Sequence, residues 1–223
     1  MRTTLDERLN EIYDDILKMG RLIQDTVNNA IKAFICGDTE LAQKIIDNDT
    51  KVDDFDISIE EKCLYVQAEH QPVAGDLRFI HSANLIVIYL ERIGDIAVSI
   101  AKLVKRLYLQ EKKPIKKGLL DIIIEMGSIV QSILGKALES FKDRDAKLAL
   151  KLEQKDVAID DLQKTLYQQL YSKSSKDEDY IKLVTNLSLM SRYIERIGDN
   201  SVNIGERVTY FLTGDFRAIH SDI

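Results

Sequence analysis

The sequence predicts an all-α protein built from two tandem, pseudo-twofold-related three-helix bundles. Helix breakers are scarce, since 223 residues include only two prolines and ten glycines, and this leaves room for long helices. The second half of the chain also repeats the first. Finally, apolar residues recur every three or four positions, which is the period of an amphipathic helix. In the first predicted helix they are Ile12, Ile16, Met19, Ile23 and Val27.

The internal repeat is carried by several segments in a constant register. DDILKMGRLIQDTVNNAIKAF at 14–34 matches DIIIEMGSIVQSILGKALESF at 121–141, with a spacing of 107 residues. Further along, YLERIGD at 89–95 matches YIERIGD at 193–199, with a spacing of 104 residues. Chance does not hold one register over several segments, so we interpret the pattern as a duplication. We therefore expect two domains, residues 1–112 and 113–223.

Each copy is predicted to contain three helices. In the first copy, a helix through 12–34 precedes one from about Thr39 to Gln71, which begins after Asp38 as its N-cap. Pro72 then opens a third helix. A polar and basic segment at 110–118, interrupted by Pro114 and Gly118, joins the copies. The predicted helices of the second copy are residues 119–142, 145–173 and 179–212.

The composition indicates a soluble protein that does not bind nucleic acid. The net charge is −6 and the pI about 5.2, whereas nucleic-acid binding favours a basic face. Cys36 and Cys63 lack CxxC spacing, so we interpret them as free thiols in a reducing cytoplasm. The N-terminal segment has no apolar signal core. The longest apolar stretch, around Leu85–Leu90, is far shorter than a membrane span.

Acidic residues form pairs with i, i+4 spacing at matching places in the two copies. Such residues lie on one face of a helix, where like charges repel. In antiparallel neighbouring helices, residues equidistant from the turn lie side by side. Asp53 and Glu91 are each 19 residues from Pro72, so acids of the second and third helices should meet at one level. The pairs are Asp49 with Asp53, Glu91 with Asp95, Asp156 with Asp160, and Glu195 with Asp199.

Four carboxylates at one level favour a bound cation, because clustered anions do not all stay ionised without one. Their oxygen atoms suit hard cations such as Mg²⁺, Mn²⁺, Ca²⁺ or iron. The position three residues after Glu91 or Glu195 is glycine rather than the histidine of ferritin-like di-iron enzymes. This argues against oxygen activation. In the alternative interpretation the acids are solvated or paired with Arg92 and Arg196, and the protein is a metal-free helical adaptor.

Two motifs resemble the signature of the PhoU family, and the resemblance extends over essentially the whole chain. The motifs are QPVAGDLRFI at 71–80, followed by YLERIGDIAVSIA at 89–101, and YIERIGDNSVNIGERV at 193–208. The resemblance implies two three-helix bundles that bind metal ions, often as multinuclear iron or zinc clusters, through ExxxD motifs and acids of the neighbouring helix. It assigns the metal ligands to Glu91, Asp95, Glu195 and Asp199, with Asp49, Asp53, Asp156 and Asp160 opposite.

The same resemblance adds a further candidate ligand and implies a function. Asn203 follows the second motif as in the family, but Ser99 replaces this asparagine in the first copy, so we expect the first copy to lose metal more readily. The resemblance implies a cytoplasmic, commonly dimeric protein that represses the phosphate-starvation response, acting at the membrane with the phosphate ABC transporter and a sensor histidine kinase.

We therefore expect a regulator rather than an enzyme. The alternative is a carboxylate-ligated metalloenzyme, which would need a general base and a substrate pocket. The basic linker between the copies is either solvated or approaches an acidic partner or anionic lipid. Its lysines are Lys112, Lys113, Lys116 and Lys117.

Overall fold

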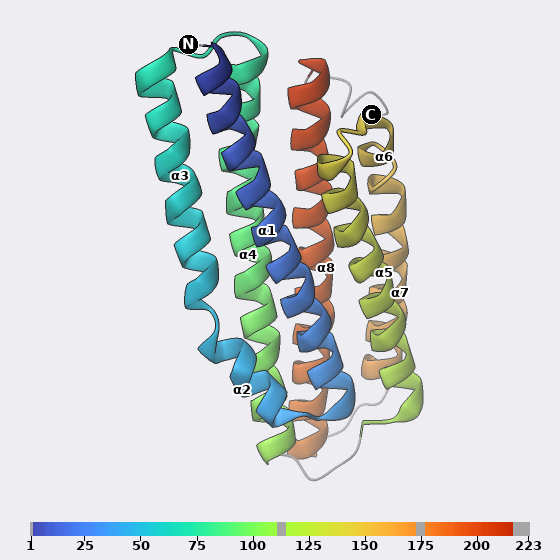
Figure 1. The fold of residues 1–223 in the computed structure, drawn as a ribbon. Coiled ribbons are helices and arrows are strands. Elements are labelled where there is room, and N and C mark those ends of the chain that lie inside the picture. The colour runs from blue at the N-terminus through green and yellow to red at the C-terminus, as the bar shows by residue number, and fades with distance from the viewer. Residues whose placement is uncertain (1, 111–114, 173–176, 216–223) are drawn as a thin grey trace.

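A computed structural model describes residues 2–110, 115–172 and 177–215, and these residues form helices and no strands (Figure 1). The all-α prediction is therefore confirmed. The first copy contains α1 (Arg2–Cys36), α2 (Thr39–Asp47), α3 (Thr50–His70) and α4 (Gly75–Gln110). The second contains α5 (Lys117–Lys142), α6 (Ala146–Ala149), α7 (Glu153–Tyr171) and α8 (Glu178–Thr213). The predicted domain boundary lies outside the described residues.

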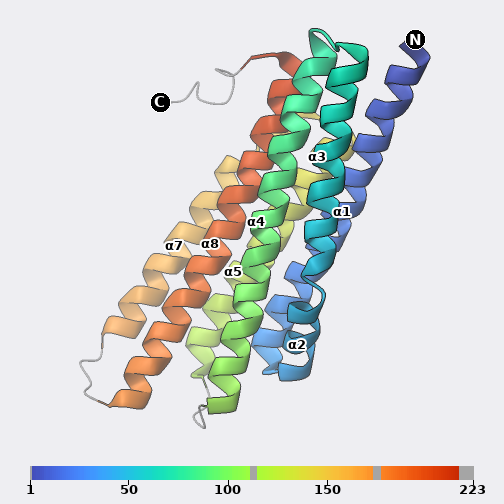
Figure 2. The same cartoon turned by 90° about the vertical axis from the view of Figure 1, so that its left-hand side faces the viewer.

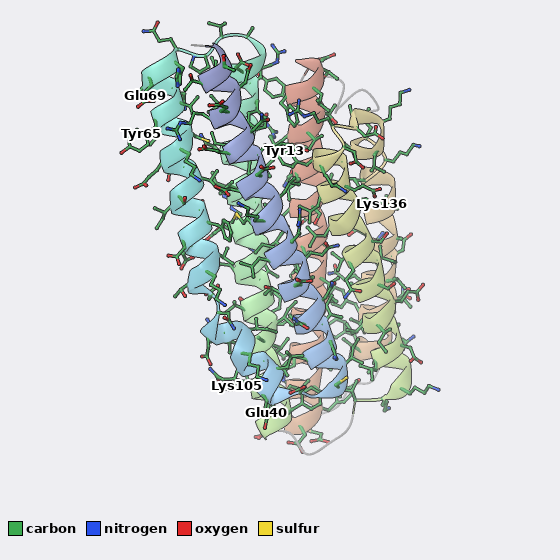
Figure 3. All side chains as sticks on the ribbon, viewed as in Figure 1. Tyr13, Glu40, Tyr65, Glu69, Lys105 and Lys136 are labelled. Carbon is green, nitrogen blue, oxygen red and sulfur yellow. The ribbon has the colours of Figure 1, made fainter. Side chains whose placement is uncertain are left out.

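The two bundles lie side by side and share one hydrophobic core. Helix α4 of the first copy packs most extensively on α8 of the second, and α1 packs on α5. Both pairs are antiparallel, while α3 and α7 lie on the outside (Figures 1 and 2). On the outer face of α3, Tyr65 and Glu69 point into solvent (Figure 3).

The α1–α5 contact shows the pseudo-twofold relation at the level of single residues. A Cβ atom on Gly20 would lie 2.6 Å from Cδ2 of Leu138, and one on Gly127 would lie 2.9 Å from Cγ2 of Ile31. Gly127 is the repeat equivalent of Gly20, and Leu138 that of Ile31, both at the spacing of 107 residues. Each helix therefore offers a glycine to the same position of the other, which is the mutual contact that a twofold axis produces.

The second predicted helix of each copy is not continuous, so that prediction was wrong. In the first copy α2 ends at Asp47 and α3 begins at Thr50. The side chain of Asn48 donates a 2.6 Å hydrogen bond to the carbonyl of Lys44, which is one way short polar side chains compete with the helical ladder. In the second copy the break separates α6 from α7. Helix α4 begins at Gly75 rather than at Pro72.

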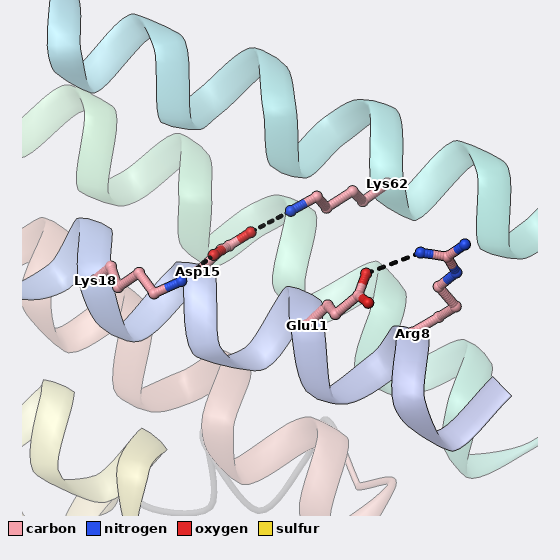
Figure 4. A network of polar contacts seen from close by, with 5 residues as sticks. All are labelled: Arg8, Glu11, Asp15, Lys18 and Lys62. Carbon is pink, nitrogen blue, oxygen red and sulfur yellow. Dashed lines mark hydrogen bonds and ion pairs between the residues drawn. The ribbon is translucent and has the colours of Figure 1, made fainter. Parts of the chain in front are cut away.

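Polar contacts join α1 to its neighbours on both sides. The Asp15 carboxylate accepts hydrogen bonds from Lys62 of α3 and, at 2.8 Å, from Lys18; Arg8 and Glu11 pair nearby at 3.1 Å (Figure 4). Burial opposes ionisation of Asp15, but the two lysine hydrogen bonds outweigh it and hold its pKa below the ordinary value.

On the other side of α1, the Tyr13 hydroxyl donates to the carbonyl of Lys142 at the end of α5. The Tyr13 ring also stacks on Phe141, with 4.9 Å between ring centroids. These contacts join the first copy to the second.

Among the described residues, α5 alone is long and apolar enough to cross a membrane, by length and composition only, with a mean hydropathy of 1.5. Its apolar residues Ile123, Met126 and Val130 are fully buried, and the helix packs on α8, α7 and α1. We therefore interpret α5 as a core helix. The expectation that the longest apolar stretch lies near Leu85–Leu90 overlooked it.

Candidate metal centres

The first carboxylate cluster lies between the start of α3 and the middle of α4. Asp49 directly precedes α3 and Asp53 lies in its first turn, while Glu91 and Asp95 are one turn apart on α4. Burial, then the charges of Asp53 and Asp95, raise the pKa of Asp49. The interaction of Asp49 with Asp95 across the two helices is the pairing predicted from equal distances to the turn.

Glu91 shows the second predicted pairing and reveals an acid that the sequence analysis missed. Its pKa is raised by burial, then by Asp95, Asp56 and Asp53. The pKa of Asp56 is itself raised by burial, then by Glu60 and Asp53. Asp56 follows Asp53 by three residues, a spacing that also places two side chains on one helix face. The first cluster is therefore richer in acids than the motif alone indicates.

The second carboxylate cluster lies between α7 and α8 and contains a cation of its own. Burial and the charge of Asp199 raise the pKa of Glu195, while Arg192 opposes the shift and Asp160 adds to it. Burial also raises the pKa of Asp199, again opposed by Arg192 and favoured by Asp160. Arg192 donates to Glu195 Oε1 at 2.6 Å. The side chain of Asp156 lies outside the described part of the structure.

Glu195 also has an oxygen atom that lacks a partner. Its Oε2 is buried and accepts no hydrogen bond within the described residues. A buried carboxylate oxygen normally has a donor or a cation beside it. Asn203 lies one turn beyond Asp199 on α8 and is half-buried, as is Ser99 at the matching place on α4.

The wall behind the first cluster is apolar. A Cβ atom on Gly94 would lie 3.0 Å from Cδ1 of Ile23 in α1 and 3.4 Å from Cγ1 of Val52 in α3. Gly94 therefore allows close helix packing. At this level α1 contributes Ile23 rather than an acid, as expected from the sequence. Asp53 and Asp95 are exposed, so the cluster opens to solvent on the side away from the core.

The carboxylates interact but do not enclose an ion in this arrangement. Within the described ranges, no three side chains of Asp, Glu, His or Cys converge closely enough to hold a metal. The raised pKa values show that these acids repel one another. A cation would relieve this repulsion, and a donor set made of carboxylate oxygens fits a hard metal ion.

Comparison with known families finds one match in each copy. The model of the PhoU domain matches residues 16–104 and 123–208. The phosphate-specific transport system accessory protein PhoU homolog of Pseudomonas aeruginosa is 36% identical over 206 residues, covering 92% of this chain and 84% of the relative. The accessory protein PhoU of Escherichia coli is 30% identical over 215 residues, covering 96% and 88%.

Solved structures with the same fold show the same likeness. The crystal structure of PhoU from Pseudomonas aeruginosa superposes with a TM-score of 0.87 at 35% identity, covering 94% of this chain and 99% of that one. The phosphate transport system regulatory protein PhoU from Streptococcus pneumoniae gives 0.85 at 30% identity, covering 95% and 98%.

Proposed function

Because the chain belongs to the PhoU family, we propose that it is a metal-binding negative regulator of phosphate uptake. In this proposal it acts from the cytoplasm on a phosphate ABC transporter and on the sensor histidine kinase of the phosphate-starvation response. It works as a homodimer held at the membrane by these partners. The names of its relatives, accessory proteins of the phosphate-specific transport system, support the association with transport.

The metal-binding part of the proposal rests mainly on one observation. In the first copy, acids of α3 and α4 raise one another's pKa across the helix pair, and in the second copy Asp160 does the same to Glu195 and Asp199. A structural role alone does not account for like charges gathered at matching places of two copies. Mg²⁺, Mn²⁺, iron or zinc bound there would offset the repulsion. Near the solvent, such an ion would keep positions open for water, phosphate or a partner's acidic group.

A regulator is favoured over a carboxylate-ligated metalloenzyme because of what surrounds the clusters. The side that faces the core is closed by Ile23 and Val52, and the acids face solvent rather than a lined substrate pocket. A turnover assay of metal-loaded protein with phosphate esters separates the two functions. Sustained, metal-dependent hydrolysis would favour the enzyme.

Elemental analysis of two matched double variants tests the metal centres. We expect Glu91→Gln with Asp95→Asn to remove metal from the first copy, and Glu195→Gln with Asp199→Asn to remove it from the second. Each should lower the metal content per chain while circular dichroism still shows a helical protein, because the repelling charges are removed together with the cation. An unchanged metal content in both variants would refute the assignment.

The same proteins test the link to transport. The metal-loaded chain should co-purify with the phosphate transporter from membranes, and the metal-depleted double variants should do so less. Equal recovery of all proteins would separate metal binding from partner binding.

A further inference from the structure

A cavity of about 490 Å³ lies where the two copies meet at one end of the bundle. It is formed by the first turns of α1 and α4, the end of α8, and the residue that follows the end of α5. These helix ends lie together in Figure 1. The volume is in the range of small-molecule sites. The cavity is separate from both carboxylate clusters, which lie near the middle of α4 and α8.

Arg144, on the wall of this cavity, has a strained backbone. Its φ is +51°, in the left-handed region that residues with a side chain rarely adopt. Its repeat equivalent is Gly37, with φ +67°. Both helices end in the same turn, since Asp38 N–H donates to Ala33 and Asp145 N–H donates to Ser140, each at 2.9 Å.

The first copy thus uses glycine where the second keeps arginine at a cost in backbone energy. Such an outlier points to a role of the side chain. The guanidinium of Arg144 lies 5.2 Å from the centre of the Tyr13 ring, a cation–π contact that holds it beside the cavity.

A second guanidinium, that of Arg78, lines the same cavity. Its Nε is buried and has no hydrogen-bond partner among the described residues. A Cβ atom on Gly214 would lie 3.4 Å from both Cζ and Nε of Arg78, so the end of α8 packs directly on this group. In the part of the chain that the structure describes, no ion pair joins Arg78 or Arg144 to a carboxylate. A buried donor without a partner is costly and calls for an acceptor.

The chemistry of the cavity wall selects the kind of acceptor. Two guanidinium groups beside the positive N-terminal end of α4 favour a phosphate group. Leu9, Phe79 and Phe211 provide an apolar wall for an organic moiety. Asp6 and Asp76 also line the cavity; their carboxylates accept hydrogen bonds from hydroxyl or amino groups and disfavour ligands with several phosphates.

We propose that this cavity binds a small phosphomonoester, whose phosphate is held by Arg78 and Arg144 and whose hydroxyl or amino groups contact Asp6 and Asp76. Inorganic phosphate would occupy only the arginine end and bind more weakly. The proposal does not depend on the metal centres.

Calorimetric titration of the full chain, after chelation of metals, tests the ligand class. The probes are AMP and glucose 6-phosphate, compared with adenosine, glucose and inorganic phosphate. We expect at least one ester to bind, and to bind at least tenfold more tightly than its unphosphorylated parent. The absence of binding by both esters, or equal binding of ester and parent, would overturn the proposal.

Two variants locate the site. Arg144→Gly removes the guanidinium and relieves the strained φ, so its Tm should stay unchanged or rise while affinity for the ester falls at least tenfold. Arg78→Gln should weaken binding similarly. Lys32→Gln, at an exposed cation of α1, is the matched control and should bind as the wild type does. Wild-type affinity in both arginine variants would overturn the proposal, as would ester binding that needs metal and survives both substitutions.

Discussion

The two carboxylate clusters occupy equivalent places in the two copies but balance their charge differently. In the second copy Arg192 pairs with Glu195 at 2.6 Å and opposes the pKa shifts of Glu195 and Asp199. The residue at the matching position of the first copy is Ile88, and there Asp56 adds another acid. Duplication has preserved the geometry while the electrostatics have diverged.

This difference changes the expected order of metal loss. Ser99 in place of asparagine led to the expectation that the first copy releases metal more readily. The charge balance favours the opposite order, because Arg192 can neutralise Glu195 when the ion leaves, whereas the first cluster is left with uncompensated anions. We therefore now expect the second cluster to lose its metal first.

Exchanging the two residues is the strongest test of this comparison. Ile88→Arg combined with Arg192→Ile should reverse the order of metal loss. If each change alters affinity about tenfold, the ratio of the two affinities shifts about 100-fold, or about 2.7 kcal/mol. Metal release to a chelator is measured in backgrounds that retain one cluster, with Glu91→Gln/Asp95→Asn or Glu195→Gln/Asp199→Asn. An unchanged order would show that Arg192 does not compete with the ion.

A smaller effect is expected where the two copies meet at α1 and α5. Gly127→Ala should destabilise the protein by about 1–2 kcal/mol, because its new methyl meets Ile31, a buried and β-branched side chain. Gly20→Ala meets the flexible end of the half-buried Leu138, so helix propensity should roughly offset the contact. Urea unfolding measures both. Equal losses of stability would mean that the contact responds alike on its two sides.

The smallest expected effect concerns the contact between Asp15 and Lys62. It belongs to the first copy alone, since the equivalent positions hold Ile122 and Gln169. Lys62→Met should cost about 0.5 kcal/mol at neutral pH. Because the folded-state pKa of Asp15 is lowered from 3.8, this contribution is present above that pH and disappears as the pH falls further.

Urea unfolding at neutral pH and near pH 3 measures the contribution of this contact. Lys51→Met, at an exposed lysine of the same helix, is the matched control. A cost for Lys62→Met that stays constant down to pH 3 would assign it to packing rather than to charge.

The parts of the structure that follow from helical periodicity were predictable. Equal distances from the turn placed Asp49 with Asp95 and Asp53 with Glu91, because antiparallel helices with one rise per residue keep their levels aligned. The break at Asn48 was not predicted, since it depends on local competition for the carbonyl of Lys44. The cavity of Arg78 and Arg144 was not predicted either, because those residues come from different copies and meet only through packing.

The contacts between the copies have a consequence for how such a chain arises. Gly20 faces Leu138 as Gly127 faces Ile31, so each copy receives from the other what an identical subunit would supply. A half-length ancestor could therefore build the same bundle as a homodimer. Fusion into one gene then releases the two halves from identity, so that each position can mutate separately. Arginine at 144 opposite glycine at 37, and arginine at 192 opposite isoleucine at 88, are changes that a strict homodimer would have to make in both subunits at once.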